Sequence, residues 1–181
     1  SYLWYGGGLK KDYIKASKIQ KQTSINFSKL LELVAKSFPN TRIRFTTSNP
    51  QDMHDDVLYT MAKYNNICNH IHLPVQSGSD KILYKMNRKH TVFEYLNLVK
   101  KIKRILPDCS ISQDMITGFP DETEDDHLAT LNLMDNVKYD FGFMFKYSER
   151  PGTLAARKLN DNVPEEIKKR RLSEIIDLQL K

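Results

Sequence analysis

The feature that most constrains the fold of this chain is a unit of one strand followed by one helix, which recurs along the sequence. Short runs rich in β-branched and aromatic residues cover residues 42–48, 70–75, 110–116 and 139–147, and we expect a strand at each. Longer stretches with apolar residues at helical spacing lie between and after these runs. Strands that alternate with helices form a parallel sheet covered by the helices, so the sequence predicts an α/β fold.

Residues that favour helix N-termini precede the apolar stripes. Thr91 and Glu94 have the spacing of a capping box, in which each side chain binds the other residue's backbone N–H. Asn49 and Pro50 combine an N-cap with a proline at the first helical position, and the apolar pattern continues from there through Met61. We expect helices to begin at or near Asn26, Asn49, Asp80, Thr91, Thr123 and Pro164.

Four strands are too few to close an eight-stranded barrel, so the pattern leaves two architectures open. One is an open, doubly wound sheet, and the other is part of a (β/α) barrel. Both architectures bind their ligands at the carboxyl ends of the strands. The loops in which to look for a site are therefore residues 46–50, 74–79, 117–122 and 147–153.

These loops and strand ends carry polar groups that suit an anion or a nucleoside. Residues 76–79 place an amide, two hydroxyls and a glycine ahead of a helix N-terminus, where free N–H groups favour negative charge. Asp114 lies near the end of an otherwise apolar strand, and Arg150 lies in a Pro-Gly turn. Simpler interpretations stay open: a serine N-cap, an aspartate in a helix interface, and a surface ion pair between Arg150 and Glu149.

The charge of the chain favours a polyanionic partner. Its 181 residues carry a net charge of +6, with a pI near 9.2. Eight Lys and Arg residues lie between Asp80 and Arg104, against two acids, and residues 168–171 form a second basic cluster. Solvated helix faces are the alternative interpretation of both clusters. No apolar run approaches the length of a membrane span.

Other conspicuous residues do not define a site by themselves. Cys68 and Cys109 lack the short spacing of a zinc or redox motif, and we expect reduced, buried thiols. His70 and His72 share a strand face, but no third ligand has suitable spacing, so we expect them to pack or form hydrogen bonds. Residues 6–8 are three glycines without the Gly-Lys-Ser/Thr ending of a phosphate loop.

Taken together, five segments resemble the successive motifs of one family. The order and approximate spacing of these segments match the radical S-adenosylmethionine methylthiotransferases, and the Leu-Pro-Val-Gln-Ser-Gly-Ser form is similar to the tRNA-modifying, MiaB-type branch. The similarity covers nearly the whole chain. The segments are residues 42–50, 72–80, 86–91, 114–120 and 147–153.

The resemblance implies a partial parallel (β/α) barrel, an S-adenosylmethionine cofactor and two [4Fe–4S] clusters. Family members add a methylthio group to an isopentenylated adenosine beside the tRNA anticodon. One S-adenosylmethionine is cleaved reductively to a radical that abstracts hydrogen from the target, and another supplies the methyl group. The implied partners are the tRNA anticodon stem-loop, a sulfur donor and an electron donor, in the cytoplasm and without a membrane.

The resemblance also assigns candidate site residues. Those for S-adenosylmethionine are Gln76, Ser77, Asp114, Ile116 and Arg150. Those for RNA are Lys81, Lys85, Arg88, Lys89, Lys168 and Arg171. No catalytic residue and no metal ligand is expected within this chain.

The departures from the family pattern define what we expect this chain to be. It lacks the Cys-x-x-x-Cys-x-x-Cys loop of the radical cluster, and Asp121 stands where relatives often have glycine. We therefore expect residues 1–181 to be a partial radical-SAM barrel without its first strands, inactive alone and prone to self-association. We expect residues 164–181 to form a helix that leads toward an absent TRAM domain. The alternative function is a stand-alone, basic RNA-binding α/β module.

Overall fold

A three-stranded parallel sheet forms the centre of the molecule. The computed structural model describes residues 2–3, 17–19, 25–46 and 49–181. The strand order is β3–β4–β5, and all pairings are parallel, so the three carboxyl ends lie at one edge of the sheet. Three of the four expected strands are thus confirmed. Their bounds are His70–His72 for β3, Ser110–Thr117 for β4 and Phe141–Lys146 for β5.

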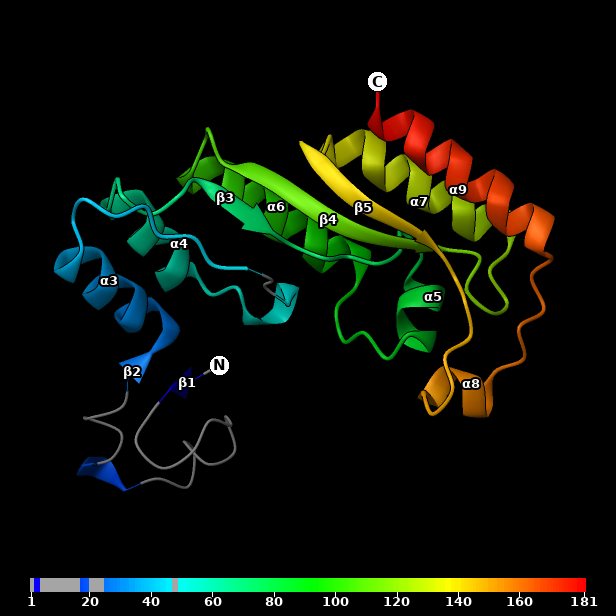
Figure 1. Ribbon diagram of the computed structural model, residues 1–181, viewed down its shortest axis with the longest axis horizontal. Coiled ribbons are helices and arrows are strands. Elements are labelled where there is room, and N and C mark those ends of the chain that lie inside the picture. The colour runs from blue at the N-terminus through cyan, green and yellow to red at the C-terminus, as the bar shows by residue number, and fades with distance from the viewer. Residues whose placement is uncertain (1, 4–16, 20–24, 47–48) are drawn as a thin grey trace.

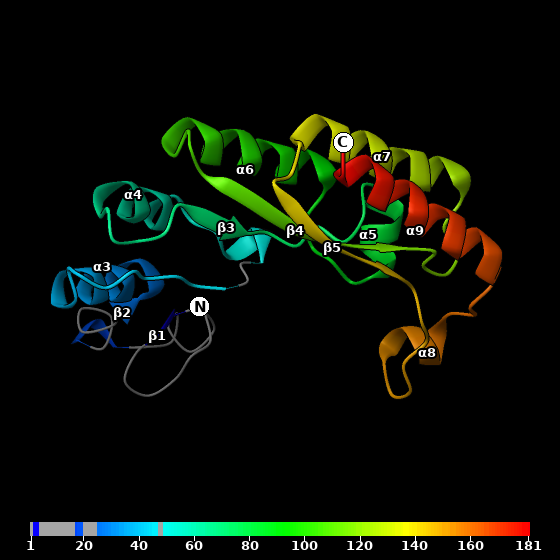
Figure 2. The same cartoon turned by 45° about the horizontal axis from the view of Figure 1, so that its top comes forward.

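Helices cover one face of this sheet. Figures 1 and 2 show α6 (Val92–Ile105), α7 (Glu124–Val137) and α9 (Glu165–Gln179) side by side against it. The core between the two layers contains Ile111 and Met115 of β4, which are 1% and 0% exposed. Among the described residues, no helix lies against the opposite face of the sheet in Figure 2.

The expected capping residues start the helices as the sequence predicts. Both halves of the capping box are present at Thr91, ahead of α6, and an equivalent box at Thr123 opens α7. The Asn26 side chain accepts from Lys29 N at the start of α3 (Phe27–Ser37). Ser79 caps α5 (Asp80–Lys85), and Pro164 precedes α9. The side-chain caps are strong signals because each one satisfies an N–H group that the helix cannot satisfy itself, whereas Pro164 makes no side-chain cap hydrogen bond.

The segment before β3 differs from expectation. Residues 42–46 form only an isolated parallel bridge, in which Ile43 pairs with Ile67, and residues 47 and 48 lie outside the described part. The helix expected from Asn49 to Met61 is two elements, the 3-10 turn η1 (Pro50–Asp52) and α4 (Asp55–Lys63). The chain is extended at His54, the N-cap of α4, and this extended residue separates the two elements.

Three short elements were not expected from the sequence. At the N-terminal side, β1 (Tyr2–Leu3) pairs antiparallel with β2 (Ile25–Asn26). The glycines at 6–8 lie outside the described residues. Helix α8 (Leu154–Lys158) follows β5, and Figure 1 shows α5 and α8 near the ends of β4 and β5 to which the arrowheads point. Both helices therefore belong to the edge of the sheet where a ligand is expected.

Candidate functional site

The uncovered face of the sheet is aromatic and polar. Register pairs Asp114 of β4 with Phe143 of β5, and Ile116 with Phe145. Alternate residues of a strand point to the same side, so these four lie on the face opposite the buried Ile111 and Met115. The exposed fractions of Phe141, Phe143 and Phe145 are 40%, 53% and 53%.

A hydrogen-bonded cluster occupies the polar part of this face. Ser112 Oγ lies 3.0 Å from His70 Nε2 and 2.8 Å from His72 Nδ1. His72 Nε2 is 3.4 Å from Asp114 Oδ1, and Arg44 contacts the other nitrogen of His70 at 2.9 Å. Burial, and then the charge of Arg44, lower the pKa of His70, which favours its neutral form. Both histidines thus have hydrogen-bond partners, as the sequence predicts.

Three of the proposed cofactor residues come together at the end of β4. Gln76 forms an isolated parallel bridge with Met115: its N–H donates to Asp114 O, and its carbonyl accepts from Ile116 N, both at 2.9 Å. Gln76 has a φ of 79°, and its side chain makes no hydrogen bond within the described part of the chain. The Asp114 side chain is 29% exposed. The backbone of Gln76 therefore lies against the strand end that carries Asp114 and Ile116.

The loop after Gln76 is closed by the protein itself. Ser77 is fully buried, with its hydroxyl 3.4 Å from that of Thr130 on α7, and Gly78 N donates to the same threonine at 2.9 Å. Ser79 Oγ donates to Asp126 at 2.6 Å. The chain's own Asp126 therefore lies beside the N-terminus of α5 and accepts from the Ser79 side chain there. Ser77 and Ser79 attach the loop to α7.

Arg150 lies in the exposed loop that leads from β5 to α8. Its carbonyl accepts from the backbone N–H and the hydroxyl of Thr153, at 3.3 and 2.9 Å. Within the described residues its guanidinium has no ion pair, and the alternative partner Glu149 does not bind it. The structure therefore places Arg150 at the same end of the sheet as Asp114, without direct contact between them.

This edge fits S-adenosylmethionine but not an iron–sulfur cluster. The open aromatic face suits a purine ring, while the Gln76 amide and the Asp114 carboxylate have unused hydrogen-bonding capacity. By contrast, Cys109 precedes the amino end of β4, and burial raises the pKa of its thiol to about 12. In the described part of the chain, no group of three or more His, Cys, Asp or Glu could hold a metal ion.

The expected RNA-binding cations divide into two groups. Lys89 is exposed, and Arg88 is partly buried, which lowers its pKa. Lys81 donates to Asp126 at 2.7 Å, and Lys85 pairs with Asp121. Two cations of α5 therefore attach it to the first turn of α7 and to the loop before α7.

Lys168 and Arg171 require a correction. We expected both to bind RNA, but each is only 4% exposed and has carboxylate partners inside the protein. Burying a charge without a partner is costly, and these pairs satisfy that requirement. Both side chains are therefore unavailable to an RNA phosphate in this conformation.

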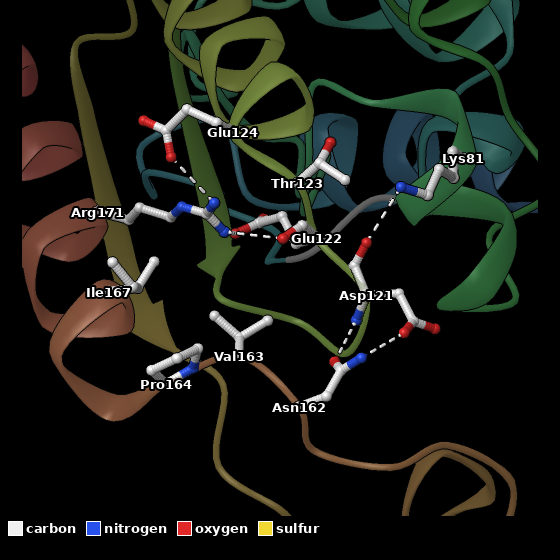
Figure 3. A pocket seen from close by; sticks show the side chains of 10 residues that line it. All are labelled: Lys81, Asp121, Glu122, Thr123, Glu124, Asn162, Val163, Pro164, Ile167 and Arg171. Carbon is white, nitrogen blue, oxygen red and sulfur yellow. Dashed lines mark hydrogen bonds and ion pairs between the residues drawn. The ribbon is translucent and has the colours of Figure 1, made fainter.

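Sequence reasoning also missed Glu122. Figure 3 shows it between Arg171 of α9 and the turn that follows β4, beside a pocket of about 530 Å³. Its side chain is 1% exposed, and its carboxylate accepts from Gly118 N at 2.6 Å. The sequence does show an acid, Glu122, four residues after the glycine at the end of β4. It does not show that the cation that pairs with this acid, Arg171, lies 49 residues later on α9.

The comparison with protein families decides the classification. Residues 9–134 match the family model of the Radical SAM superfamily. The chain belongs to this superfamily. Two solved structures support the same fold. Coproporphyrinogen III oxidase from Escherichia coli gives a TM-score of 0.64 at 21% sequence identity, and the match covers 90% of this chain and 36% of that one. Methylornithine synthase gives a TM-score of 0.57 at 16% identity, and the match covers 84% of this chain and 43% of that one. The parallel sheet is thus part of a TIM-like radical SAM barrel.

Curated relatives are similar along the whole chain. Each is named tRNA-2-methylthio-N(6)-dimethylallyladenosine synthase. The protein from Christiangramia forsetii is 67% identical over 100% of this chain and 38% of its own length. The Flavobacterium johnsoniae protein is 65% identical with the same coverage, and the Bacteroides thetaiotaomicron protein is 54% identical over 92% of this chain and 37% of its own. The radical SAM chain therefore spans less than two fifths of these relatives. Among its described helices, none is long and apolar enough to cross a bilayer.

Proposed function

We propose that this chain is part of a tRNA methylthiotransferase that adds a methylthio group to an isopentenylated adenosine next to the anticodon. The observation that carries the proposal is the 65% identity, over all 181 residues, to a relative named for that product. The proposal places the protein with its tRNA in the cytoplasm. A sulfur donor and an electron donor complete the reaction, and the TRAM domain expected after residues 164–181 would provide further RNA contacts.

The cofactor proposal uses the carboxyl edge of the sheet. Asp114 and Gln76 would bind polar groups of S-adenosylmethionine, and Ile116 would pack against its purine, while Ser77 keeps the loop against α7. Arg150 would reach the cofactor carboxylate from the loop after β5. When bound with its cluster, the cofactor supplies a carbon radical and a methyl group. The cysteines for both [4Fe–4S] clusters would have to come from outside these 181 residues.

The RNA proposal uses the exposed surface of α5 and the segment that follows it. Lys89 is exposed, without an ion pair among the described residues, and Arg88 lies beside it. Tyr84 on α5 is 83% exposed and can stack on an unpaired base. Lys81 and Lys85 hold α5 in place through Asp126 and Asp121, so this surface is fixed before RNA arrives.

The test uses the protein expressed from its complete reading frame. Anaerobically reconstituted protein is incubated with S-adenosylmethionine, a reductant, sulfide and tRNA that carries isopentenyladenosine, and the nucleosides are analysed by mass spectrometry. We expect the methylthio derivative. Asp114→Ala should lower product formation at least about tenfold, equivalent to about 1.4 kcal/mol.

Asp108→Ala is the matched control, because Asp108 is exposed near the opposite end of the same strand. Its activity should equal that of the unmodified protein. Absence of the methylthio product from unmodified protein that contains its clusters would contradict the proposal. Tight tRNA binding without any modification would favour the RNA-binding module instead.

A further inference from the structure

The turn that ends β4 is held in an unusual backbone conformation. Gly118 has a φ of 71°, a region that residues with a side chain rarely occupy. Its N–H donates to Glu122 Oε2 at 2.6 Å, and the Thr117 hydroxyl lies 3.4 Å from the same oxygen. This turn follows directly after Asp114 and Ile116, so its position fixes the edge that we propose binds the cofactor.

A buried arginine of α9 holds Glu122. Arg171 Nη1 donates to the Glu122 carboxylate at 2.8 Å and to its backbone carbonyl at 3.0 Å, and Nη2 pairs with Glu124 at 3.0 Å (Figure 3). Burial raises the pKa of Glu122, against the opposing effects of Gly118 and Arg171. Because the carboxylate bridges Arg171 and the Gly118 amide, loss of the arginine leaves a buried acid unpaired at the turn.

One helical turn earlier, Lys168 contacts the same glycine from another side. A Cβ on Gly118 would lie 2.4 Å from Lys168 Cγ, so the lysine stem covers the turn closely. The ammonium group donates to both Asp161 oxygens at 2.6 Å and lies 5.4 Å from the centre of the Tyr147 ring. Tyr147 follows β5, and its N–H donates to Thr117 O at 2.8 Å. Lys168 therefore contacts residues just after both strands.

We propose that Lys168 and Arg171 are positioning residues through which α9 fixes the carboxyl edges of β4 and β5, and that they are not phosphate contacts. The inference rests on the proposed function, because that edge is the proposed cofactor site. The inference gives a role to two buried cations, which the sequence of the basic run at residues 168–171 does not distinguish from solvated ones. The occupancy of the cofactor site would then depend on the docking of α9.

The experiment compares Lys168→Met, Arg171→Met and Arg171→Lys with Lys169→Met in the complete, reconstituted protein. Lys169 is exposed and has no ion pair among the described residues, so it is the matched control. The affinity for S-adenosylmethionine, measured by calorimetry, should fall about tenfold in Arg171→Met. Losses of this size are typical when a residue that supports a ligand-binding residue is removed. Arg171→Lys should recover part of the affinity. Lys169→Met should bind normally.

Two further readouts separate positioning from other roles. Hydrogen exchange of residues 117–122 should accelerate in both Met variants, with α6 as the unchanged internal reference. The salt dependence of tRNA binding should stay that of the unmodified protein, whereas loss of a phosphate contact would reduce its slope. Unchanged cofactor affinity in both variants, or a reduced slope, would overturn the inference. If the unmodified protein fails to bind S-adenosylmethionine, the proposed function fails, and exchange at residues 117–122 still tests the α9 contact separately.

Discussion

Gly118 and Gly152 adopt similar backbone angles in different surroundings. Their φ values are 71° and 82°, both in the region that favours glycine. A Cβ on Gly118 would meet the Cβ and Cγ of Lys168 at 3.1 and 2.4 Å, whereas a Cβ on Gly152 would meet nothing within 4 Å. Lys168 cannot move aside freely, because Asp161 binds its ammonium group. Substituting alanine at each glycine therefore separates two contributions to the loss of stability: the unfavourable φ, present at both positions, and the crowding by Lys168, present only at Gly118.

We predict that Gly118→Ala lowers the free energy of unfolding by about 2–4 kcal/mol, the sum of a strained φ and overpacking. Gly152→Ala is the control and should cost only about 1 kcal/mol, since the backbone term acts alone. Urea denaturation of both variants measures the difference. Equal losses at the two positions would show that Lys168 does not restrain the turn.

At the residue scale, sequence reasoning failed where a contact joins distant segments. Asp114, Ile116 and Gln76 could be predicted to meet, because parallel strands bring their carboxyl ends to one edge. Lys168 and Arg171 look like a solvated basic run, but Arg171 pairs with Glu122, 49 residues earlier in the turn after β4, and Lys168 pairs with Asp161 in the segment before α9. Lys168, Arg171 and Ile175 have the i, i+3, i+7 spacing of residues on one helix face. This spacing was the local signal that both cations lie on the buried face of α9.

The N-terminus of α7 shows how one acid can join several elements. Asp126 accepts from the Thr123 N–H in the capping box, from Ser79 before α5 and from Lys81 on α5, at 2.9, 2.6 and 2.7 Å. Burial acts to raise the pKa of Asp126, but the hydrogen bonds from Lys81, Ser79 and Thr123 outweigh it and lower the pKa below its usual value. Its charged form therefore stabilises the fold.

We predict that Asp126→Asn lowers the free energy of unfolding by about 1.5–3 kcal/mol at pH 7, the range for hydrogen bonds to a charged group. Because the folded pKa lies below the unfolded one, this contribution is present above about pH 4 and is lost as the pH falls further. The variant should thus approach the unmodified protein in acid. Thermal unfolding from pH 7 to pH 3 measures this. Asp125→Asn, at an exposed position in the same helical turn, should change little, and an equal effect there would contradict the prediction.

At the element scale, the predictable features were those with local causes. The caps at Asn26, Thr91 and Thr123 each satisfy nearby N–H groups, and all three start helices as expected. The strand expected at residues 42–48 failed because strand pairing depends on a neighbour, and Ile43 finds only a single bridge. The sequence does not indicate how much of a strand-like segment will pair.

At the scale of the whole molecule, the described helices cover one face of the sheet and leave the other open. Phe141, Phe143 and Phe145 leave about half of their surfaces exposed on the other face, beside His70 and His72. The outer edges of β3 and β5 also lack strand partners within the described residues. Contiguous apolar surface and open edges both favour association.

We therefore predict that residues 1–181, purified as given, self-associate through this aromatic face. Burying one phenylalanine contributes about 1.5–3 kcal/mol, so Phe143→Ser should weaken the association constant at least about tenfold. Sedimentation velocity across protein concentration measures this, with thermal unfolding to verify that the variant folds. Phe93→Ser is the control, because Phe93 is 72% exposed but lies on α6, on the covered side of the sheet. A chain that stays monomeric at every concentration, or a Phe93 variant that dissociates as readily, would show that the aromatic face does not drive association.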